Sequence, residues 1–149
     1  MPGQIPPLLS TSVYGPLGLK HLPRLWLKIL LHACGRLPEG YRHGAGGFDE
    51  ALTTAVGIDN AALIAYIEEH KPSYVALEGW VREHAANLTP DAIAGFNAHV
   101  ESAQLPEAMR ADRFARIGFS DPTYTGAIAL NDLDDWAAMH EALAGAAST

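Results

Sequence analysis

The sequence predicts an all-α protein: a single compact domain of six or seven helices around a central apolar helix, residues 22–34. Three observations support this prediction. Apolar residues recur at intervals of three and four along most of the chain after residue 20. Residues that begin helices, and glycines that end them, flank these apolar segments. No internal repeat and no convincing series of strands is present.

The first 19 residues predict a different kind of structure. They are rich in proline and glycine and contain no charged side chain. A free tail would ordinarily be more polar. We therefore expect residues 1–19 to form an extended arm over a helical domain of residues 20–149.

The predicted central helix has clear ends. Pro23 suits the first turn, where its missing N–H would have had no partner, and Gly35 suits the end of the helix. Apolar side chains cover almost its whole circumference, which is typical of a helix with neighbours on most sides. They are Leu22, Leu25, Trp26, Leu27, Ile29, Leu30, Leu31, Ala33 and Cys34.

A basic stripe interrupts this apolar surface, because Lys20, Arg24, Lys28 and His32 recur every four residues. Burying an unpaired cation is costly, so each should find an acidic partner, water or a bound anion. We expect Arg24 to pair with an acid within Asp132–Asp135, mainly for structure. Lys28 and His32 are expected to face a ligand pocket.

The rest of the chain predicts further helices joined by turns. They are expected over residues 48–56, 59–70, 73–87, from 90 through 100, over 106–117, and from Asn131 or Asp132 to Gly145. The glycine cluster in the loop 36–47 indicates turns rather than a phosphate loop, because no strand precedes it. Residues 119–130 are expected to be irregular, with a short extended segment. The acidic run 131–135 favours a helix cap over a calcium loop.

Composition and charge limit the function classes. The chain of 149 residues has a formal charge of −7, which argues against binding to nucleic acid. No segment approaches the roughly 18 apolar residues of a membrane span. Cys34 is the single cysteine, so we expect a cytoplasmic protein in which Cys34 is buried. Only 18% of residues are charged, which indicates an apolar pocket, an oligomer interface, or both.

Charge is also distributed unevenly. The first 38 residues contain four cationic residues and no acid, which leaves −11 for the remainder. Either a basic central helix packs among acidic helices, or the basic residues form an anion site.

The order and spacing of several landmarks resemble a bacterial family known as domain of unknown function 5069, over about residues 20–137. The landmarks are Leu22-Pro23-Arg24-Leu25, Lys28, Gly35, Glu39-Gly40-Tyr41, Phe48-Asp49, Val56-Gly57-Ile58-Asp59, Trp80, Pro90, Ile93, Arg113-Phe114 and Asp132-Leu133-Asp134. The resemblance implies a small soluble helical domain and no established activity. The chain departs from the family pattern at Leu27, where an acid is usual, and at Tyr124-Thr125-Gly126, where Arg-Thr-Asp is usual. These departures favour a more apolar pocket.

The histidines suggest where chemistry could occur. No pair of the seven has His-x-x-x-His spacing, so we expect no metal. No dinucleotide fingerprint or cofactor lysine motif is visible, so we expect no cofactor either. Cations near His32 would keep its imidazole neutral and able to accept a proton. His84 is interpreted either as a core histidine or as a general base. The candidate catalytic residues are His32, His84 and Tyr41, and the candidate ligand-binding residues are Arg24, Lys28, Trp26, His43 and Trp80.

These features lead to two hypotheses of different classes. The first is a small-molecule-binding protein, with a leaning to a cofactor-independent lyase, isomerase or hydrolase that uses proton transfer on a largely apolar ligand. The second is a non-enzymatic interaction or homodimerisation module. An enclosed cavity that reaches His32 or His84 would favour the first, and a flat apolar patch the second.

Overall fold

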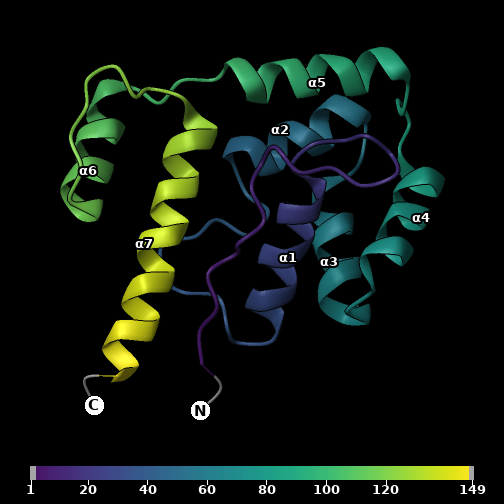
Figure 1. The fold of residues 1–149 in the computed structure, drawn as a ribbon. Coiled ribbons are helices and arrows are strands. Elements are labelled where there is room, and N and C mark those ends of the chain that lie inside the picture. Colours follow the sequence, from purple (N-terminus) through teal and green to yellow (C-terminus); the bar gives the residue numbers. More distant parts are fainter. Residues whose placement is uncertain (1–2, 148–149) are drawn as a thin grey trace.

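The computed structural model describes the backbone of residues 3–147, and it confirms the all-α prediction (Figure 1). The described residues form seven helices and no sheet, with one isolated bridge between Gln104 and Gly126. The helices are α1 (Leu22–Ala33), α2 (Gly47–Val56), α3 (Asn60–His70), α4 (Tyr74–His84), α5 (Pro90–Ser102), α6 (Glu107–Ile117) and α7 (Ala127–Ala147). None of the described helices is both long and apolar enough to cross a bilayer.

Helix α1 lies at the centre of the core, as its apolar circumference predicts. Leu22, Leu25 and Ile29 are completely buried, and α1 packs against α3 and α4. The core also takes side chains from α2, α3, α4 and α5. Burying each such side chain stabilises the fold by about 1.5–3 kcal/mol.

The last two helices form a separate pair beside this core. Helix α6 packs against α7 and has no buried residue of its own. Helix α7 also contacts α5, which runs across one end of the molecule and connects the two groups of helices (Figure 1).

Residues 3–19 contain no helix. Their first part runs between α1 and α7, and their later part loops toward α4, where the backbone N–H of Leu17 donates to Glu78 (Figure 1). The backbone N–H of Ile5 donates to the carbonyl of Arg36, and Ser10 Oγ donates to Asp132 on α7 at 3.1 Å. Leu19, at the end of this segment, is fully buried in the core. The segment therefore helps to hold α7 next to α1.

Helix α7 differs from its prediction at both ends. It begins at Ala127, not at Asn131 or Asp132, because the segment Ala127–Leu130 is helical rather than extended. The backbone N–H of Ala127 donates to the carbonyl of Ala103, and Ala127 and Leu130 are buried. The acidic run 131–135 therefore lies within the helix and does not cap it. The helix also continues past Gly145.

Helix α4 ends at His84, three residues earlier than predicted. The backbone N–H groups of Ala86 and Asn87 donate instead to the carbonyls of Gly57 and Val56. The predicted burial of Cys34 is wrong as well, because Cys34 lies beyond the last turn of α1 and is exposed.

Candidate functional site

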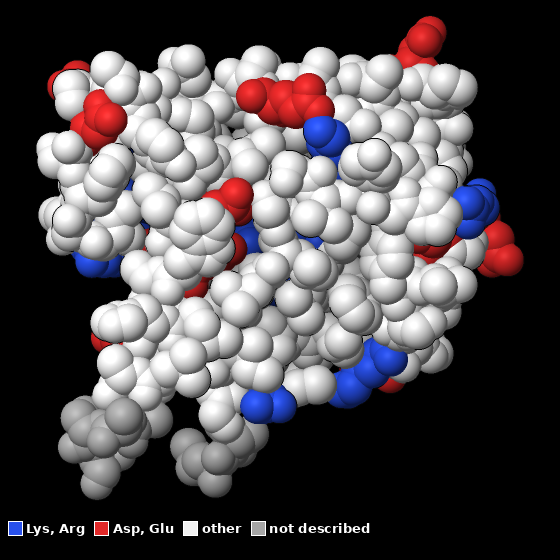
Figure 2. Space-filling model, viewed as in Figure 1, with Lys and Arg blue, Asp and Glu red and all other residues white. Residues whose placement is uncertain are grey.

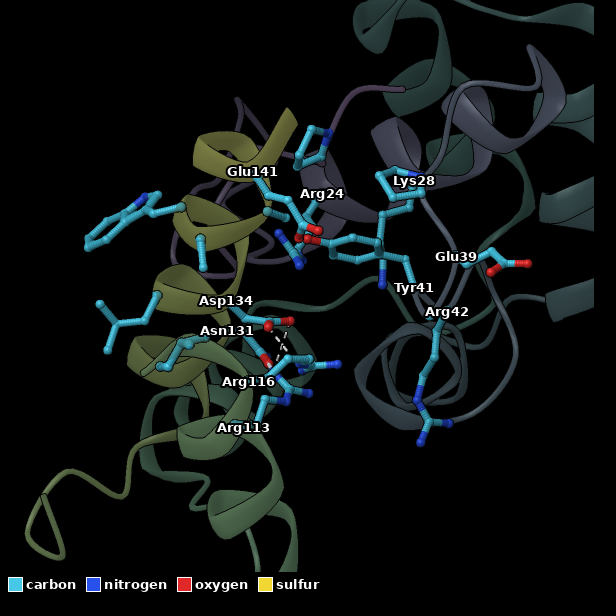
Figure 3. Close-up of a pocket in the computed structure, with 18 of the residues that line it drawn as sticks. Arg24, Lys28, Glu39, Tyr41, Arg42, Arg113, Arg116, Asn131, Asp134 and Glu141 are labelled. Atoms are coloured by element: carbon cyan, nitrogen blue, oxygen red, sulfur yellow. Dashed lines mark hydrogen bonds and ion pairs between the residues drawn. The ribbon is translucent and has the colours of Figure 1, made fainter. Parts of the chain in front are cut away.

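A cleft with a volume of about 1170 Å³ lies between α1 and the α6–α7 pair. We call it the central cleft. One wall consists of α1, the loop 38–42 and the first turn of α2, and the other consists of α6 and α7 (Figure 3). The face shown in Figure 2 is mostly uncharged near its centre, where basic atoms are visible only in recesses.

A buried ion pair joins the two walls. Arg24 on α1 makes a bidentate contact with Asp135 on α7, with Nη1–Oδ2 and Nη2–Oδ1 distances of 2.6 and 3.1 Å. Nη1 also donates to the carbonyls of Pro7 and Leu9 in the N-terminal segment. Tyr41 donates its hydroxyl to Asp135 Oδ1 at 3.0 Å. This contact confirms the predicted pairing of Arg24 with an acid from residues 132–135.

A second buried network is centred on Asp49. Its Oδ1 accepts from His21 Nε2 at 2.6 Å and from Lys28 Nζ at 2.8 Å, and its Oδ2 accepts from the backbone N–H of Gly44 at 2.9 Å. His21 Nδ1 lies 2.9 Å from the hydroxyl oxygen of Thr11. Both carboxylate oxygens are thus used, and the network links α1, α2 and the N-terminal segment.

Two backbone conformations make this network possible. His21 adopts a left-handed conformation, with φ 73°, directly before α1. Such a conformation in a residue other than glycine costs about 1–3 kcal/mol, so the surrounding contacts must hold it in place. Gly44 has φ 121°, and a Cβ there would come within 2.5 Å of Ile64. Glycine therefore allows the loop to direct its N–H at Asp49.

The network sets the protonation states. Burial opposes ionisation of Asp49, but the hydrogen bond from His21 and the charge of Lys28 prevail and lower its pKa to about 2. Burial lowers the pKa of His21, although Asp49 opposes this shift. A neutral His21 would then donate from Nε2 to the carboxylate and accept at Nδ1 from Thr11. Burial also lowers the pKa of Lys28, again against the effect of Asp49.

Tyr41 is a proton donor in the wall of the central cleft. Burial and the neighbouring Asp135 carboxylate raise the pKa of its hydroxyl. It therefore keeps its proton at neutral pH, and this O–H is donated to Asp135 Oδ1.

The opposite wall carries a group of polar side chains from α6 and α7 (Figure 3). Arg116 lies 2.9 Å from Asp134, and Arg113 lies 3.8 Å from the same carboxylate. Arg113 also donates to the side chain of Asn131. One carboxylate is thus shared by two guanidinium groups.

The structure brings three of the sequence-predicted site residues to the central cleft, namely Arg24, Lys28 and Tyr41. His32 and His43 lie outside its lining and stack on each other, with ring centroids 3.7 Å apart.

The remaining candidates lie on the other side of the core. Trp26 donates its indole N–H to the carbonyl of Pro72 at 2.9 Å. Trp80 stacks between Tyr66 and His84. His84 is exposed, so its predicted place on the buried face of α4 is wrong. It is the last residue of the helix, and its ring stacks on Trp80 at the surface rather than in the core.

Sequence reasoning missed His21, Asp49 and Arg116 as parts of one site. One signal was available for Asp49. It shares a helical face with Leu52 and Val56, both fully buried, so the spacing places a carboxylate on an apolar face. Such a carboxylate needs buried donors. No comparable signal distinguishes His21 or Arg116.

The chain matches the model of the family described as Domain of unknown function (DUF5069) over residues 13–136, and it belongs to that family. This confirms the resemblance of the sequence landmarks. A search of curated proteins found no match.

Proposed function

We propose that this DUF5069 chain is a cytoplasmic small-molecule-binding protein whose ligand, a small organic anion with an apolar body, occupies the central cleft. The distribution of charge is the observation that carries the proposal. Five of the ten Lys and Arg residues line the central cleft, against five of the 17 Asp and Glu residues. A chain with a net charge of −7 thus concentrates its positive charge where a ligand would enter.

The internal ion pairs indicate which cations remain for a ligand. Arg24 and Lys28 face Asp135 and Asp49, so the buried part of the cleft is close to neutral. Within the ion-paired group on the α6–α7 wall, Arg113 and Arg116 share the single carboxylate of Asp134, so this group has a local surplus of positive charge.

Arg42 adds a charge on the other wall, and it forms no ion pair with the side chains that the structure describes. Three acids, Glu39, Asp112 and Glu141, also line the cleft without such pairing, and like Arg42 and Arg116 they are exposed. None of these three acids forms an ion pair with an arginine of the cleft among the described side chains. The anionic group is therefore expected near Arg113, Arg116 and Arg42.

Apolar side chains offer contacts for the rest of the ligand. The lining includes Phe48 from α2, Met109 and Ile117 from α6, and Leu133 and Trp136 from α7. Trp136 is 61% exposed and Met109 is 40% exposed, so both would lose contact with water when a ligand binds. Burial of apolar surface would add about 25 cal/mol per Å².

We further propose that the ligand undergoes cofactor-free proton transfer, in an elimination, isomerisation or hydration. Tyr41 provides a protonated hydroxyl and Lys28 an amine whose pKa is lowered by burial. The ordinary conditions for acid–base catalysis are a donor and an acceptor in reach of one ligand.

Ligand-induced stabilisation tests the binding proposal. Thermal melts would compare aryl and alkyl carboxylates with the corresponding neutral amides, at millimolar concentration. Ligand at ten times its Kd stabilises the folded state by about 1.4 kcal/mol. We expect carboxylates to raise Tm more than amides do, and Arg116→Gln to remove this difference.

Arg110→Gln is the matched control. Arg110 lies on the same helix, donates to the carbonyl of Leu105 and does not line the central cleft. It should leave the preference for carboxylates intact. Equal stabilisation by acids and amides, or none by any compound, would contradict the proposal.

The alternative proposal, an interaction or homodimerisation module, has one observation in its favour. Trp136 and Leu143 are 61% and 66% exposed and lie seven residues apart on one side of α7. Sedimentation equilibrium separates the alternatives, because a dimer that Leu143→Ser dissociates would favour this second function.

A further inference from the structure

The amine of Lys28 is buried and yet lies in the wall of the central cleft. Its side chain is 7% exposed. An ammonium group has three N–H donors. Among the described residues, Nζ has one hydrogen-bond partner, Asp49 Oδ1 at 2.8 Å. Two positions on the nitrogen are therefore available to a ligand.

The partner carboxylate does not belong to Lys28 alone. The same Oδ1 accepts from His21 Nε2 at the shorter distance of 2.6 Å, and Oδ2 accepts from Gly44. Lys28 therefore shares the hydrogen-bond acceptance of Asp49 with two other donors. Arg24, one turn earlier on α1, is a second cation close enough to disfavour the charged amine.

Some of the charged and titratable groups around the amine raise the pKa of Lys28, and others lower it. Burial and Arg24 lower the pKa of Lys28, whereas Asp49 and Asp135 raise it, and the net direction is downward. His21 shares the Asp49 carboxylate. Tyr41 faces the same cleft with its hydroxyl protonated. A neutral amine in a cleft is a nucleophile, which an ammonium is not.

We infer that Lys28 is a carbonyl-reactive amine that forms an imine with an aldehyde or ketone group of the ligand. The inference rests on the proposed function, because it uses the same cleft. Combined with the surplus charge at Arg113 and Arg116, it makes the ligand a small oxo acid, with a carbonyl group toward Lys28 and a carboxylate toward the arginines. Figure 3 shows Lys28 and these arginines on opposite walls.

The step balances without a further reactant. The Lys28 ammonium loses one proton to water, and the nitrogen lone pair forms a bond to the carbonyl carbon. The π electrons of the C=O bond move to the oxygen, which takes a proton, while the nitrogen loses one. The resulting carbinolamine expels its hydroxyl group, after protonation, as water. A C=N bond remains.

The chain makes this inference unusually easy to test, since it contains only three lysines. Lys20 pairs with Glu101, and Lys71 is exposed and donates to the carbonyl of Glu68. Lys71 is therefore an internal reference for an ordinary amine. Incubation of the full chain with glyoxylate and cyanoborohydride would reduce each imine to a stable secondary amine, which peptide mass spectrometry locates.

We expect Lys28 to be labelled several times faster than Lys71 at neutral pH, because burial lowers the pKa of Lys28 and its amine lies in the wall of the cleft that the aldehyde enters. The rate at Lys28 should also reach half its maximum at a lower pH than the rate at Lys71. A merely structural Lys28 would be protected by burial. Slower labelling, equal labelling, or equal pH profiles at the two lysines would overturn the inference.

Two further arms complete the test. Lys28→Gln should abolish the fast-labelled peptide, whereas Lys71→Gln should retain it. Glycolaldehyde, the neutral counterpart of glyoxylate, should label Lys28 more slowly, and Arg116→Gln should reduce that difference. If carboxylates raise Tm in an Arg116-dependent way but Lys28 is not labelled fast, the imine is refuted and the proposed function stands. Fast labelling without any carboxylate preference would instead refute the proposed anion ligand.

Discussion

Arg24→Ala should destabilise the fold more than any other single change in the basic stripe. The substitution leaves Asp135, which is 2% exposed, with Tyr41 as its hydrogen-bond donor. It also removes the donor for the carbonyls of Pro7 and Leu9. An unpaired buried carboxylate is costly because the protein interior solvates it poorly.

The magnitude follows from these contacts. Removal of one partner from a buried ion pair costs about 3–5 kcal/mol. Two backbone carbonyls lose a donor as well, so the upper part of this range is expected, about 4–5 kcal/mol. For a chain of this size, that corresponds to a fall in Tm of roughly 8–20 °C. Urea unfolding followed by far-ultraviolet circular dichroism would measure the free energy of unfolding.

Lys28→Ala is the comparison within the same helix. It should cost less, because Asp49 would retain His21 and the N–H of Gly44 as donors. An unchanged melt for Arg24→Ala, together with unfolding of Lys28→Ala, would refute this division between a structural arginine and a cleft-facing lysine.

A double variant tests the electrostatic reason. Arg24→Met combined with Asp135→Leu removes both charges and leaves apolar groups of similar length. Replacement of a whole buried ion pair in this way is often neutral or stabilising. We expect the double variant to be more stable than Arg24→Ala. If both lose the same free energy, an uncompensated charge is not the cause.

Two further predictions concern pH and packing. Because burial lowers the pKa of His21, the unfolded state binds more protons than the folded state below about pH 6.5. The free energy of unfolding should therefore fall as the pH falls through that region. Urea titrations at several pH values would measure this dependence, and His21→Asn should flatten it. A Cβ at Gly15 would lie 2.5 Å from Tyr74 and 2.7 Å from Glu78, so Gly15→Ala should cost about 1–3 kcal/mol in thermal melts. Gly3→Ala has open space around it and should leave Tm unchanged.

The helices could be predicted well where local chemistry decides them. Ser73 and Thr89 accept hydrogen bonds from the N–H groups three residues later, and Gly57 and Gly118 end helices in left-handed conformations. These are short-range effects that a few neighbouring residues determine. The helix boundaries were predicted wrongly where a segment distant in the sequence supplies a hydrogen-bond partner. An example is Ala127 at the start of α7, whose backbone N–H donates to the carbonyl of Ala103.

The candidate site was predictable only in part, for a related reason. The spacing of Arg24 and Lys28 on an apolar helix required acidic partners, whatever the fold. Arg24 was correctly paired with the acidic region of α7 because few other acids are clustered. The partner of Lys28, Asp49, was not identified, because its place on an apolar helical face indicates only that it needs a buried donor and not which cation supplies it.

The sequence by itself determined the helical class, the central place of α1, and the need to compensate a basic stripe, because hydrophobic periodicity and the cost of buried charge act through the chain's own spacing. Only the tertiary structure decided that His21 and Lys28 share Asp49, and that Arg113 and Arg116 on α6 share Asp134 on α7. Those contacts depend on how α2, α6 and α7 are placed against α1. That placement follows from the packing of the whole core, which no local pattern encodes.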